Sequence, residues 1–329
     1  MRLSSIGDVV HTLPALAALH GQGWQAGWLA EPLARPLLEG NPMVARAFAA
    51  PAARAFALGP ARRTLRALRA ERFDVALDLQ GLWKSAAWAR LSGARRVLGY
   101  ARPWRREGAS ALLMTERAPG AAEAVHVIDK NLALLRPLGI EAVGTRAFPL
   151  PPAEEEGARV DARLTELGLS TFVILNPGGG WASKLWPAER FGALAGLLRE
   201  QGLPSLVTWG PGEEGLAERV VSASAGAARR CFATTLLEYV ALARRACLVV
   251  AADTGPMHLA AAVGTPVVAL FGPTDPARNG PFAPQDEVVR QAPPCAPCHR
   301  RRCPRHEGVM DGIEAGVVAA AARRRLGRG

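Results

Sequence analysis

Residues 248–262, which read LVVAADTGPMHLAAA, decide the fold of this chain. An unbroken apolar run ends in Asp253, Thr254 and Gly255, and Pro256 then falls in the first turn of a helix, where proline is well tolerated. An apolar strand that leads through a short polar loop into a helix is the repeating unit of α/β folds. Ligands of open α/β sheets bind beside the carboxyl ends of the strands, so we expect this loop to belong to a binding site.

The same alternation of strands and helices extends along the rest of the chain and predicts parallel sheets with helices on both faces. Besides residues 248–252, the expected strands are residues 27–30, 44–48, 74–79, 96–99, 172–175, 205–209 and 266–271. The expected helices are residues 60–72, 82–91, 188–201, 213–223, 236–245 and 256–263. We therefore predict an α/β fold of Rossmann-like, doubly wound parallel sheets.

A proline-rich and then acidic stretch, residues 148–156 (FPLPPAEEE), interrupts the alternation and is predicted to be an interdomain linker. A length of 329 residues also favours two domains over one. We predict Rossmann-like domains at residues 1–150 and 157–329, facing a central cleft, the second with a C-terminal tail helix. Only residues 1–3 precede the first polar loop, so we expect the first strand either to be short and weakly held or to begin upstream.

The composition is that of a folded protein, because 49% of the residues are hydrophobic and 21% are charged. The chain has no uninterrupted apolar run of about 18 residues and no secretory leader, so we expect a soluble cytoplasmic protein. The net charge of +11 comes almost entirely from arginine. It reflects either an arginine-favouring genome or a surface that meets anions.

Residues 175–187, LNPGGGWASKLWP, form a second loop after an apolar strand. Gly178, Gly179 and Gly180 would let a diphosphate approach the backbone closely, and Lys184 would supply a point charge for it. The spacing is not that of a P-loop, and a plain glycine turn is the alternative interpretation.

Residues 4–14, SSIGDVVHTLP, form a small-residue loop that leads into a helix. Asp8 lies near the start of that helix, where it acts either as a helix cap or as a general base on a sugar hydroxyl. Glu213, in a strand-to-helix turn, either binds a ribose or caps a helix. His258, early on its helix, is either a site residue or a structural histidine.

Residues 4–14, 78–85 (DLQGLWKS), 177–187, 253–262 and 271–276 (FGPTDP) together resemble the motifs of glycosyltransferase family 9, the ADP-heptose:lipopolysaccharide heptosyltransferases, in that family's order. The resemblance spans nearly the whole chain. It implies a GT-B fold and an inverting, metal-independent transfer of L-glycero-D-manno-heptose from ADP-heptose to the lipopolysaccharide inner core, without a cofactor. A family-9 transferase with another donor or acceptor sugar is the alternative within this family.

The resemblance also implies a role for each candidate residue. Asp8 would deprotonate the acceptor hydroxyl, and Lys184 would neutralise the departing diphosphate. The donor-binding residues would be Gly178, Gly179, Gly180, Glu213, Asp253, Thr254, Gly255 and His258. The predicted acceptor-binding residues are Ser5, Gly7, Gln80, Lys84, Arg62, Arg66 and Arg105, and a solvated surface is the alternative for the arginines.

The expected partners are the ADP-sugar donor and a lipid A-core acceptor at the inner membrane, which a monomer would reach by peripheral contact on the cytoplasmic face. A basic nucleic-acid-binding protein is the alternative from another class. Two tyrosines and motifs gathered at strand ends argue against it.

A cysteine-rich tail contains Cys295, Cys298 and Cys303, with His299 and His306 nearby. This composition is typical of zinc sites, and inert or redox-labile thiols are the alternative. Relatives of the family do not need metal for catalysis, so the resemblance implies that any such site is structural. An odd number of cysteines without a secretory leader argues against a disulfide framework.

Overall fold

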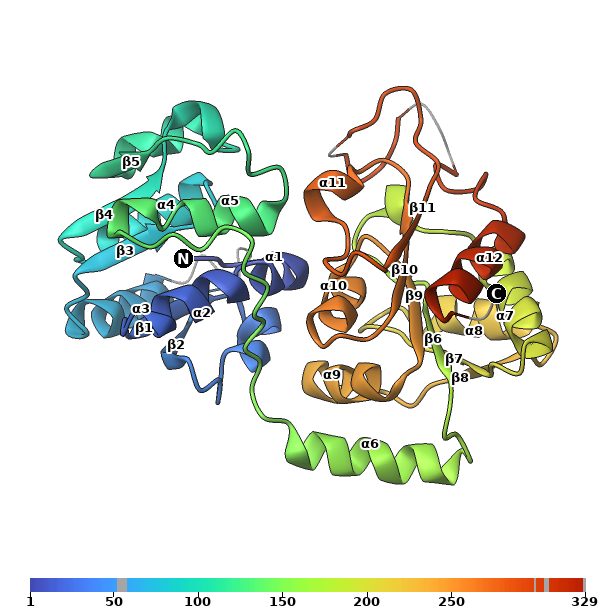
Figure 1. Ribbon diagram of the computed structural model, residues 1–329. Helices are drawn as coiled ribbons and strands as arrows, with labels where there is room; N and C mark the ends of the chain where they lie inside the picture. Colours follow the sequence, from blue (N-terminus) through green and yellow to red (C-terminus); the bar gives the residue numbers. More distant parts are fainter. Residues whose placement is uncertain (52–57, 299, 305–307, 328–329) are drawn as a thin grey trace. The chain divides into compact units, whose positions relative to one another are not determined.

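The computed structural model describes residues 1–51, 58–298, 300–304 and 308–327. The chain divides into two compact units, Met1–Pro152 and Ala153–Gly329, which are described here one at a time (Figure 1). In both units every strand pair is parallel, and the predicted α/β fold is confirmed.

The first unit contains two parallel sheets, ordered β1-β2 and β3-β4-β5. Its strands are β1 (Ala26–Ala30), β2 (Val44–Ala49), β3 (Val75–Asp78), β4 (Arg96–Tyr100) and β5 (Glu116–Ala118). Its helices are α1 (Ile6–Val10), α2 (Leu13–Gly21), α3 (Leu58–Ala70), α4 (Trp83–Leu91) and α5 (Val127–Ala133). Short 3-10 helices complete it: η1 (Pro32–Leu37), η2 (Arg102–Trp104), η3 (Gly108–Leu113) and η4 (Arg136–Leu138).

The first three residues bridge the two sheets of this unit without forming a strand. The Leu3 carbonyl accepts a hydrogen bond from Glu31 N at 2.8 Å, after β1, and the Met1 carbonyl accepts one from Leu79 N at 3.3 Å, after β3. An apolar cavity of about 100 Å³, lined by Met1 and by residues of β1 and β3, lies beside this segment. The segment is thus paired on both sides and incompletely packed.

The second unit is built on a six-stranded parallel sheet, ordered β11-β10-β9-β6-β7-β8. Its strands are β6 (Val173–Asn176), β7 (Ser205–Val207), β8 (Ala228–Arg230), β9 (Leu248–Ala252), β10 (Val267–Phe271) and β11 (Glu287–Arg290). Its helices are α6 (Glu154–Glu166), α7 (Ala188–Glu200), α8 (Glu214–Ala223), α9 (Leu236–Arg245), α10 (Gly255–Ala262), α11 (Pro276–Asn279) and α12 (Ala315–Arg325), with the 3-10 helix η5 (Ala182–Lys184).

Helices cover both faces of this sheet, as Figure 1 shows. Side chains of α7, α8 and α12 form one apolar core with alternate residues of the strands. Helices α9 and α10 lie on the other face, and α6 packs against α9. Because β6 and β9 are neighbours in the centre of the sheet, the loops that follow them lie side by side.

The acidic end of the predicted linker is helical. Glu154, Glu155 and Glu156 form the first turn of α6. Acidic side chains are favourable there because the amino end of a helix carries a partial positive charge.

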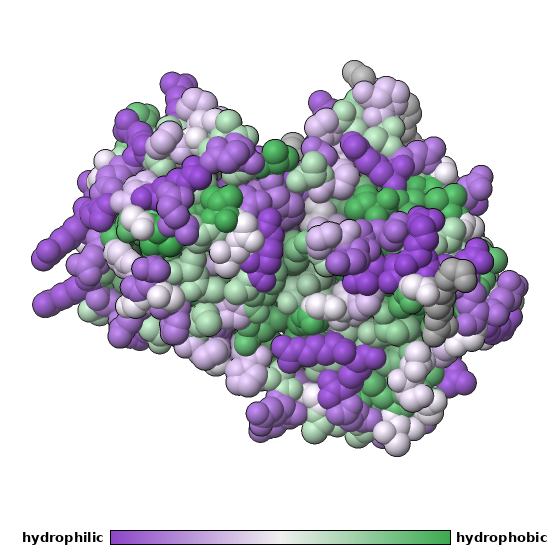
Figure 2. Space-filling view, in the orientation of Figure 1, coloured by the Kyte–Doolittle hydropathy of each residue, from purple (hydrophilic) through white to green (hydrophobic). Residues whose placement is uncertain are grey.

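In the part of the chain that the structure describes, no helix is long and apolar enough to cross a membrane. Figure 2 shows hydrophilic side chains interspersed with apolar ones over the face that it draws.

Candidate active site

Lys184 and Asp253 meet at the carboxyl ends of β6 and β9. Lys184 lies in η5, after the glycine-rich loop, and Asp253 directly follows β9. Lys184 Nζ lies 2.6 Å from Asp253 Oδ2 and donates to the Asp253 carbonyl at 3.0 Å. The ammonium also lies 4.6 Å from the centre of the Trp181 ring. The adjacent strand ends therefore place a well-held cation where ligands of such sheets bind.

Asp253 is buried and accepts hydrogen bonds from three further side chains. Thr274 Oγ1 donates to Oδ2 at 2.8 Å, Asn279 Nδ2 donates to Oδ2 at 3.1 Å, and His258 Nε2 lies 3.1 Å from Oδ1. Burial by itself would raise the pKa of Asp253, but His258 and Lys184 lower it far below its ordinary value. The carboxylate is therefore ionised, and His258 donates to it.

These contacts give Asp253 and His258 a structural role beside the one that the sequence predicts. Three donors, Lys184, Thr274 and Asn279, share Oδ2 of Asp253, and His258 meets Oδ1. His258 is buried and points its Nε2 at Asp253. Asp253 holds Lys184 and His258 holds Asp253, and their contact with a donor sugar stays a prediction.

Glu213 ties the loop after β6 to the loop after β7. Its Oε1 accepts from Gly179 N at 2.9 Å and its Oε2 accepts from Gly210 N at 2.9 Å. A Cβ on Gly178 would lie 2.0 Å from Glu213 Oε2, so the close approach of this carboxylate requires glycine at 178. Gly180, by contrast, is exposed and meets nothing within 4 Å. Glu213 shapes the loop, whatever ligand it also binds.

Thr254 and Gly255 open helix α10 beside this cluster. The Thr254 side chain donates to the Ala252 carbonyl at 3.2 Å and does not cap the helix. The N–H groups of the first turn are thus left without a side-chain acceptor from Thr254, and the helix dipole favours an anion there. With Lys184 nearby on the adjacent loop, this corner has the charge and the donors to hold a phosphate.

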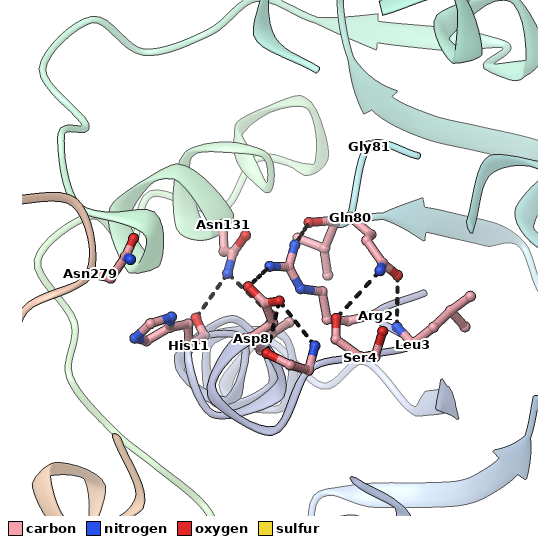
Figure 3. A network of polar contacts seen from close by, with 12 residues as sticks. Arg2, Leu3, Ser4, Asp8, His11, Gln80, Gly81, Asn131 and Asn279 are labelled. Atoms are coloured by element: carbon pink, nitrogen blue, oxygen red, sulfur yellow. Dashed lines mark hydrogen bonds and ion pairs between the residues drawn. The ribbon is translucent and has the colours of Figure 1, made fainter. Parts of the chain in front are cut away.

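In the first unit, Asp8 lies in the third position of the short helix α1 (Figure 3). Its Oδ2 accepts from Ser5 N at 3.0 Å and from Ser5 Oγ at 3.2 Å, and its Oδ1 pairs with Arg2. Burial would raise the pKa of Asp8, but the Arg2 charge and the Ser5 hydrogen bonds together lower it below its ordinary value. Asp8 therefore caps the helix and remains a partly exposed, ionised carboxylate, so the two interpretations of this residue are compatible.

The predicted acceptor-binding residues divide into two groups. Ser5 is exposed beside Asp8, and Arg62 and Arg66 are exposed on α3. Lys84 is half-buried and pairs with Glu31. These side chains remain open to a ligand in part or fully.

Three others are taken up by the protein itself. Gly7 is buried in α1. Gln80 accepts from Leu3 N at 2.9 Å and donates to the Ser4 carbonyl at 3.4 Å. Arg105, predicted to bind the acceptor, is buried and pairs with buried Asp78. The assignment of Arg105 to acceptor binding is therefore corrected: its guanidinium neutralises Asp78.

Cys295, Cys298 and Cys303 are free thiols. His299 and His306 lie outside the described residues, and among the described ones no three Cys, His, Asp or Glu side chains gather as metal ligands. The zinc interpretation of the tail stays a prediction.

The sequence analysis missed Arg2, Thr274 and Asn279. Thr274 lies in a loop that the motifs single out, so its position at a strand end was a usable signal. Arg2 and Asn279 contact Asp8 and Asp253, and no local sequence pattern predicts these contacts.

Comparisons with known proteins agree with this geometry. A model of glycosyltransferase family 9 (heptosyltransferase) matches residues 61–308. The chain is 31% identical over 318 residues to lipopolysaccharide heptosyltransferase 1 of Pseudomonas aeruginosa, covering 92% of this chain and 86% of that protein. It is 30% identical over 314 residues to lipopolysaccharide heptosyltransferase 1 of Escherichia coli K12, covering 89% and 92%. The solved structure of E. coli heptosyltransferase WaaC with ADP matches with a TM-score of 0.78 at 25% identity, covering 98% of each chain.

Proposed function

The chain belongs to glycosyltransferase family 9, with the GT-B fold of its heptosyltransferases, and we propose that it transfers L-glycero-D-manno-heptose from ADP-heptose to the lipopolysaccharide inner core with inversion. The observation that carries the proposal is the Lys184–Asp253 pair beside the first turn of α10. A buried carboxylate holds an ammonium, and the backbone N–H groups of Thr254 and Gly255 lie at the adjacent helix start, which suits a diphosphate leaving group.

The proposed reaction is a single displacement at the anomeric carbon. Asp8 accepts the proton of the acceptor hydroxyl as the oxygen attacks. The bond between the anomeric carbon and the diphosphate oxygen breaks, and the departing ADP carries its negative charge to Lys184 and the N–H groups of Thr254 and Gly255. One displacement inverts the configuration of the sugar.

The low pKa of Asp8 is compatible with its role as the base. The carboxylate is ionised at neutral pH, so it is ready to accept a proton. The hydroxyl becomes strongly acidic only as its oxygen bonds to the sugar, and the proton then moves in the transition state.

We propose an acceptor without heptose, since the chain aligns over most of its length with two relatives named heptosyltransferase 1. Ser5, Lys84, Arg62 and Arg66 would bind its phosphates and acidic sugars. Because such an acceptor is a lipid, a cytoplasmic monomer would contact the inner membrane peripherally, with its arginines attracted to anionic lipid.

The test is donor turnover. The protein is incubated with ADP-heptose and deacylated, octulosonic-acid-capped lipid A, with and without a first heptose, and ADP release and product mass are followed by mass spectrometry. We expect ADP release that requires the heptose-free acceptor. Release only with the heptose-bearing acceptor, or only with another ADP-sugar, would replace the proposed acceptor or donor within the family. No release with any pair would contradict the proposal.

A further inference from the structure

Arg2 is a buried, charged residue to which the proposed function gives no part. Its Nη2 pairs with Asp8 Oδ1, and its Nη1 donates to the carbonyl oxygen of Leu79 (Figure 3). Leu79 directly follows β3, far from Asp8 in the sequence. Arg2 therefore connects the candidate general base to the carboxyl end of β3.

The acceptor that Arg2 uses on β3 is itself fixed. The N–H groups of Gln80 and Gly81 both donate to Asp78 Oδ1 at 3.2 Å, which closes a tight turn around Leu79. Asp78 Oδ2 pairs with Arg105, and both of these side chains are fully buried. Because Asp78 is held on both oxygens, by the turn and by Arg105, the Leu79 carbonyl is a fixed point for the Arg2 guanidinium.

The backbone of Arg2 is held as firmly as its side chain. Trp28 Nε1, on β1, donates to the Arg2 carbonyl at 3.1 Å. The next residue, Leu3, donates its N–H to Gln80 Oε1 at 2.9 Å. The backbone around Arg2 is therefore held both by β1 and by the loop after β3, which restricts the movement of Arg2.

The two oxygens of Asp8 have different surroundings. Oδ1 faces the buried guanidinium of Arg2, whereas Oδ2 accepts from the backbone and from the hydroxyl of exposed Ser5. A serine hydroxyl on the surface can rotate away, and a sugar hydroxyl can take its place on Oδ2 without disturbing Oδ1.

We propose that Arg2 is the positioning residue of Asp8: it binds Oδ1, fixes the carboxylate against Leu79 and leaves Oδ2 to the acceptor hydroxyl. This inference rests on the proposed function, in which Asp8 is the base.

The other charged groups around α1 and Arg2 are engaged elsewhere. The Met1 ammonium donates to the Leu77 carbonyl at 2.6 Å, and burial lowers its pKa to about 6. Glu31 pairs with Lys84, Arg35 of η1 pairs with Glu39, and Asp78 pairs with Arg105. His11, at the carboxyl end of α1, packs edge-on against His126, the residue before α5, at 5.5 Å between ring centres. The Arg2 guanidinium is the positive charge in contact with Asp8.

The test compares Arg2→Gln, which removes the charge, with Arg2→Lys, which keeps it. Arg46→Gln is the matched control, because Arg46 forms an exposed ion pair with Glu71 in the same unit. The rate of heptosyl transfer is measured as a function of pH, and the Asp8 carboxyl is titrated by carbon NMR without substrate, its signal identified by its loss in Asp8→Asn.

In Arg2→Gln we expect kcat to fall about 10- to 100-fold with KM for ADP-heptose within about twofold, because only the placement of the base is lost. The acidic limb of kcat and the Asp8 titration should both move to higher pH, since burial then acts on Asp8 without the opposing charge. Arg2→Lys should return both toward wild type, and Arg46→Gln should change neither.

Two results separate this inference from the proposed function. If wild type transfers heptose but the Asp8 titration and kcat of Arg2→Gln are unchanged, the positioning role is wrong and the function stands. A loss of kcat with no shift in either titration, and no rescue by Arg2→Lys, also overturns it, as a merely structural effect. If wild type transfers no sugar while the titration shifts as expected, the clamp on Asp8 stands and the function is wrong.

Discussion

The two units hold similar ion pairs with opposite exposure. In Arg2–Asp8 the cation is 9% exposed and the carboxylate 40%, whereas in Lys184–Asp253 the carboxylate is 3% exposed and the cation 14%. In each pair the more exposed member is the group to which we assign chemistry, Asp8 as the base and Lys184 as the partner of the leaving group. In these two pairs we call the more exposed residue, to which we assign chemistry, the working group, and the buried residue that holds it the anchor.

The number of donors supports the same division. Asp253 receives four side-chain partners, Lys184, Thr274, Asn279 and His258. Asp8 receives Arg2 and the two donors of Ser5, of which the hydroxyl is exchangeable. Changing an anchor should lower the stability of the protein, whereas changing a working group should lower its activity. The predictions below test that contrast.

The largest effect is expected for Asp8→Asn. Without a base, kcat/KM for transfer should fall about 10²- to 10⁴-fold. The free energy of unfolding should fall less than in Asp253→Asn, because the Asp8 carboxylate is 40% exposed and Arg2 keeps the Leu79 carbonyl as a partner. The measurement is steady-state ADP release together with urea unfolding. Asp74→Asn, an exposed acid at the other end of β3, is the control and should behave as wild type.

Asp253→Asn should lower the stability of the protein more than Asp8→Asn does. Removing one member of a buried pair leaves Lys184 uncompensated, and the free energy of unfolding should fall by about 3–5 kcal/mol. Urea unfolding monitored by far-UV circular dichroism gives this value. Equal stability of Asp8→Asn and Asp253→Asn would remove the distinction between anchor and working group.

The same anchor predicts how stability depends on pH. The pKa of Asp253 is lowered on folding, so its contribution is fully present above the ordinary carboxyl value of about 4 and is lost as the pH falls below it. Between about pH 5 and 3, wild type should lose stability more steeply than Asp253→Asn, by up to about 1.4 kcal/mol per pH unit. Parallel curves would mean that Asp253 titrates alike in the folded and unfolded chain.

Thr274→Val should weaken the anchor without breaking it. One donor to Asp253 is lost, which should cost about 1–2 kcal/mol in the free energy of unfolding and a few-fold in kcat. Ser205→Ala is the matched control, because the Ser205 hydroxyl is buried and has no hydrogen-bond partner among the described residues. If both variants unfold alike, Thr274 is not part of the anchor.

The smallest effect belongs to the exposed arginines of α3. Arg66→Gln should raise KM for the acceptor by about threefold, and added salt should reduce the difference from wild type. Arg63→Gln is the control, since Arg63 lies off the face that Arg62 and Arg66 share. An equal change in both variants would assign the effect to overall charge.

Much of the fold could be predicted because it follows from local patterns. Apolar runs such as residues 248–252 and 267–271 form the strands of a buried parallel sheet, and the loops after them carry the candidate residues. Two details could not be predicted from residue type. The glutamates after the proline-rich stretch begin a helix, and Arg105 is drawn into the core by Asp78.

The pairing of side chains could not be predicted, because it depends on which strand ends become neighbours. Arg2 donates to the Leu79 carbonyl and Asn279 donates to Asp253, although each pair is well separated in the sequence. The motifs predicted that Lys184 and Asp253 belong to one site. Only the exposed fractions of the two side chains show which is the anchor and which the working group.

The most direct test of this division is the affinity of ADP for three forms of the protein, measured by titration calorimetry. The account predicts that Lys184→Met weakens ADP binding by about tenfold or more, because the diphosphate loses its cation, while Asp8→Asn stays within about twofold of wild type. Unchanged binding in Lys184→Met, or an equal loss in Asp8→Asn, would contradict the assignment of the leaving group to Lys184 and of the base to Asp8.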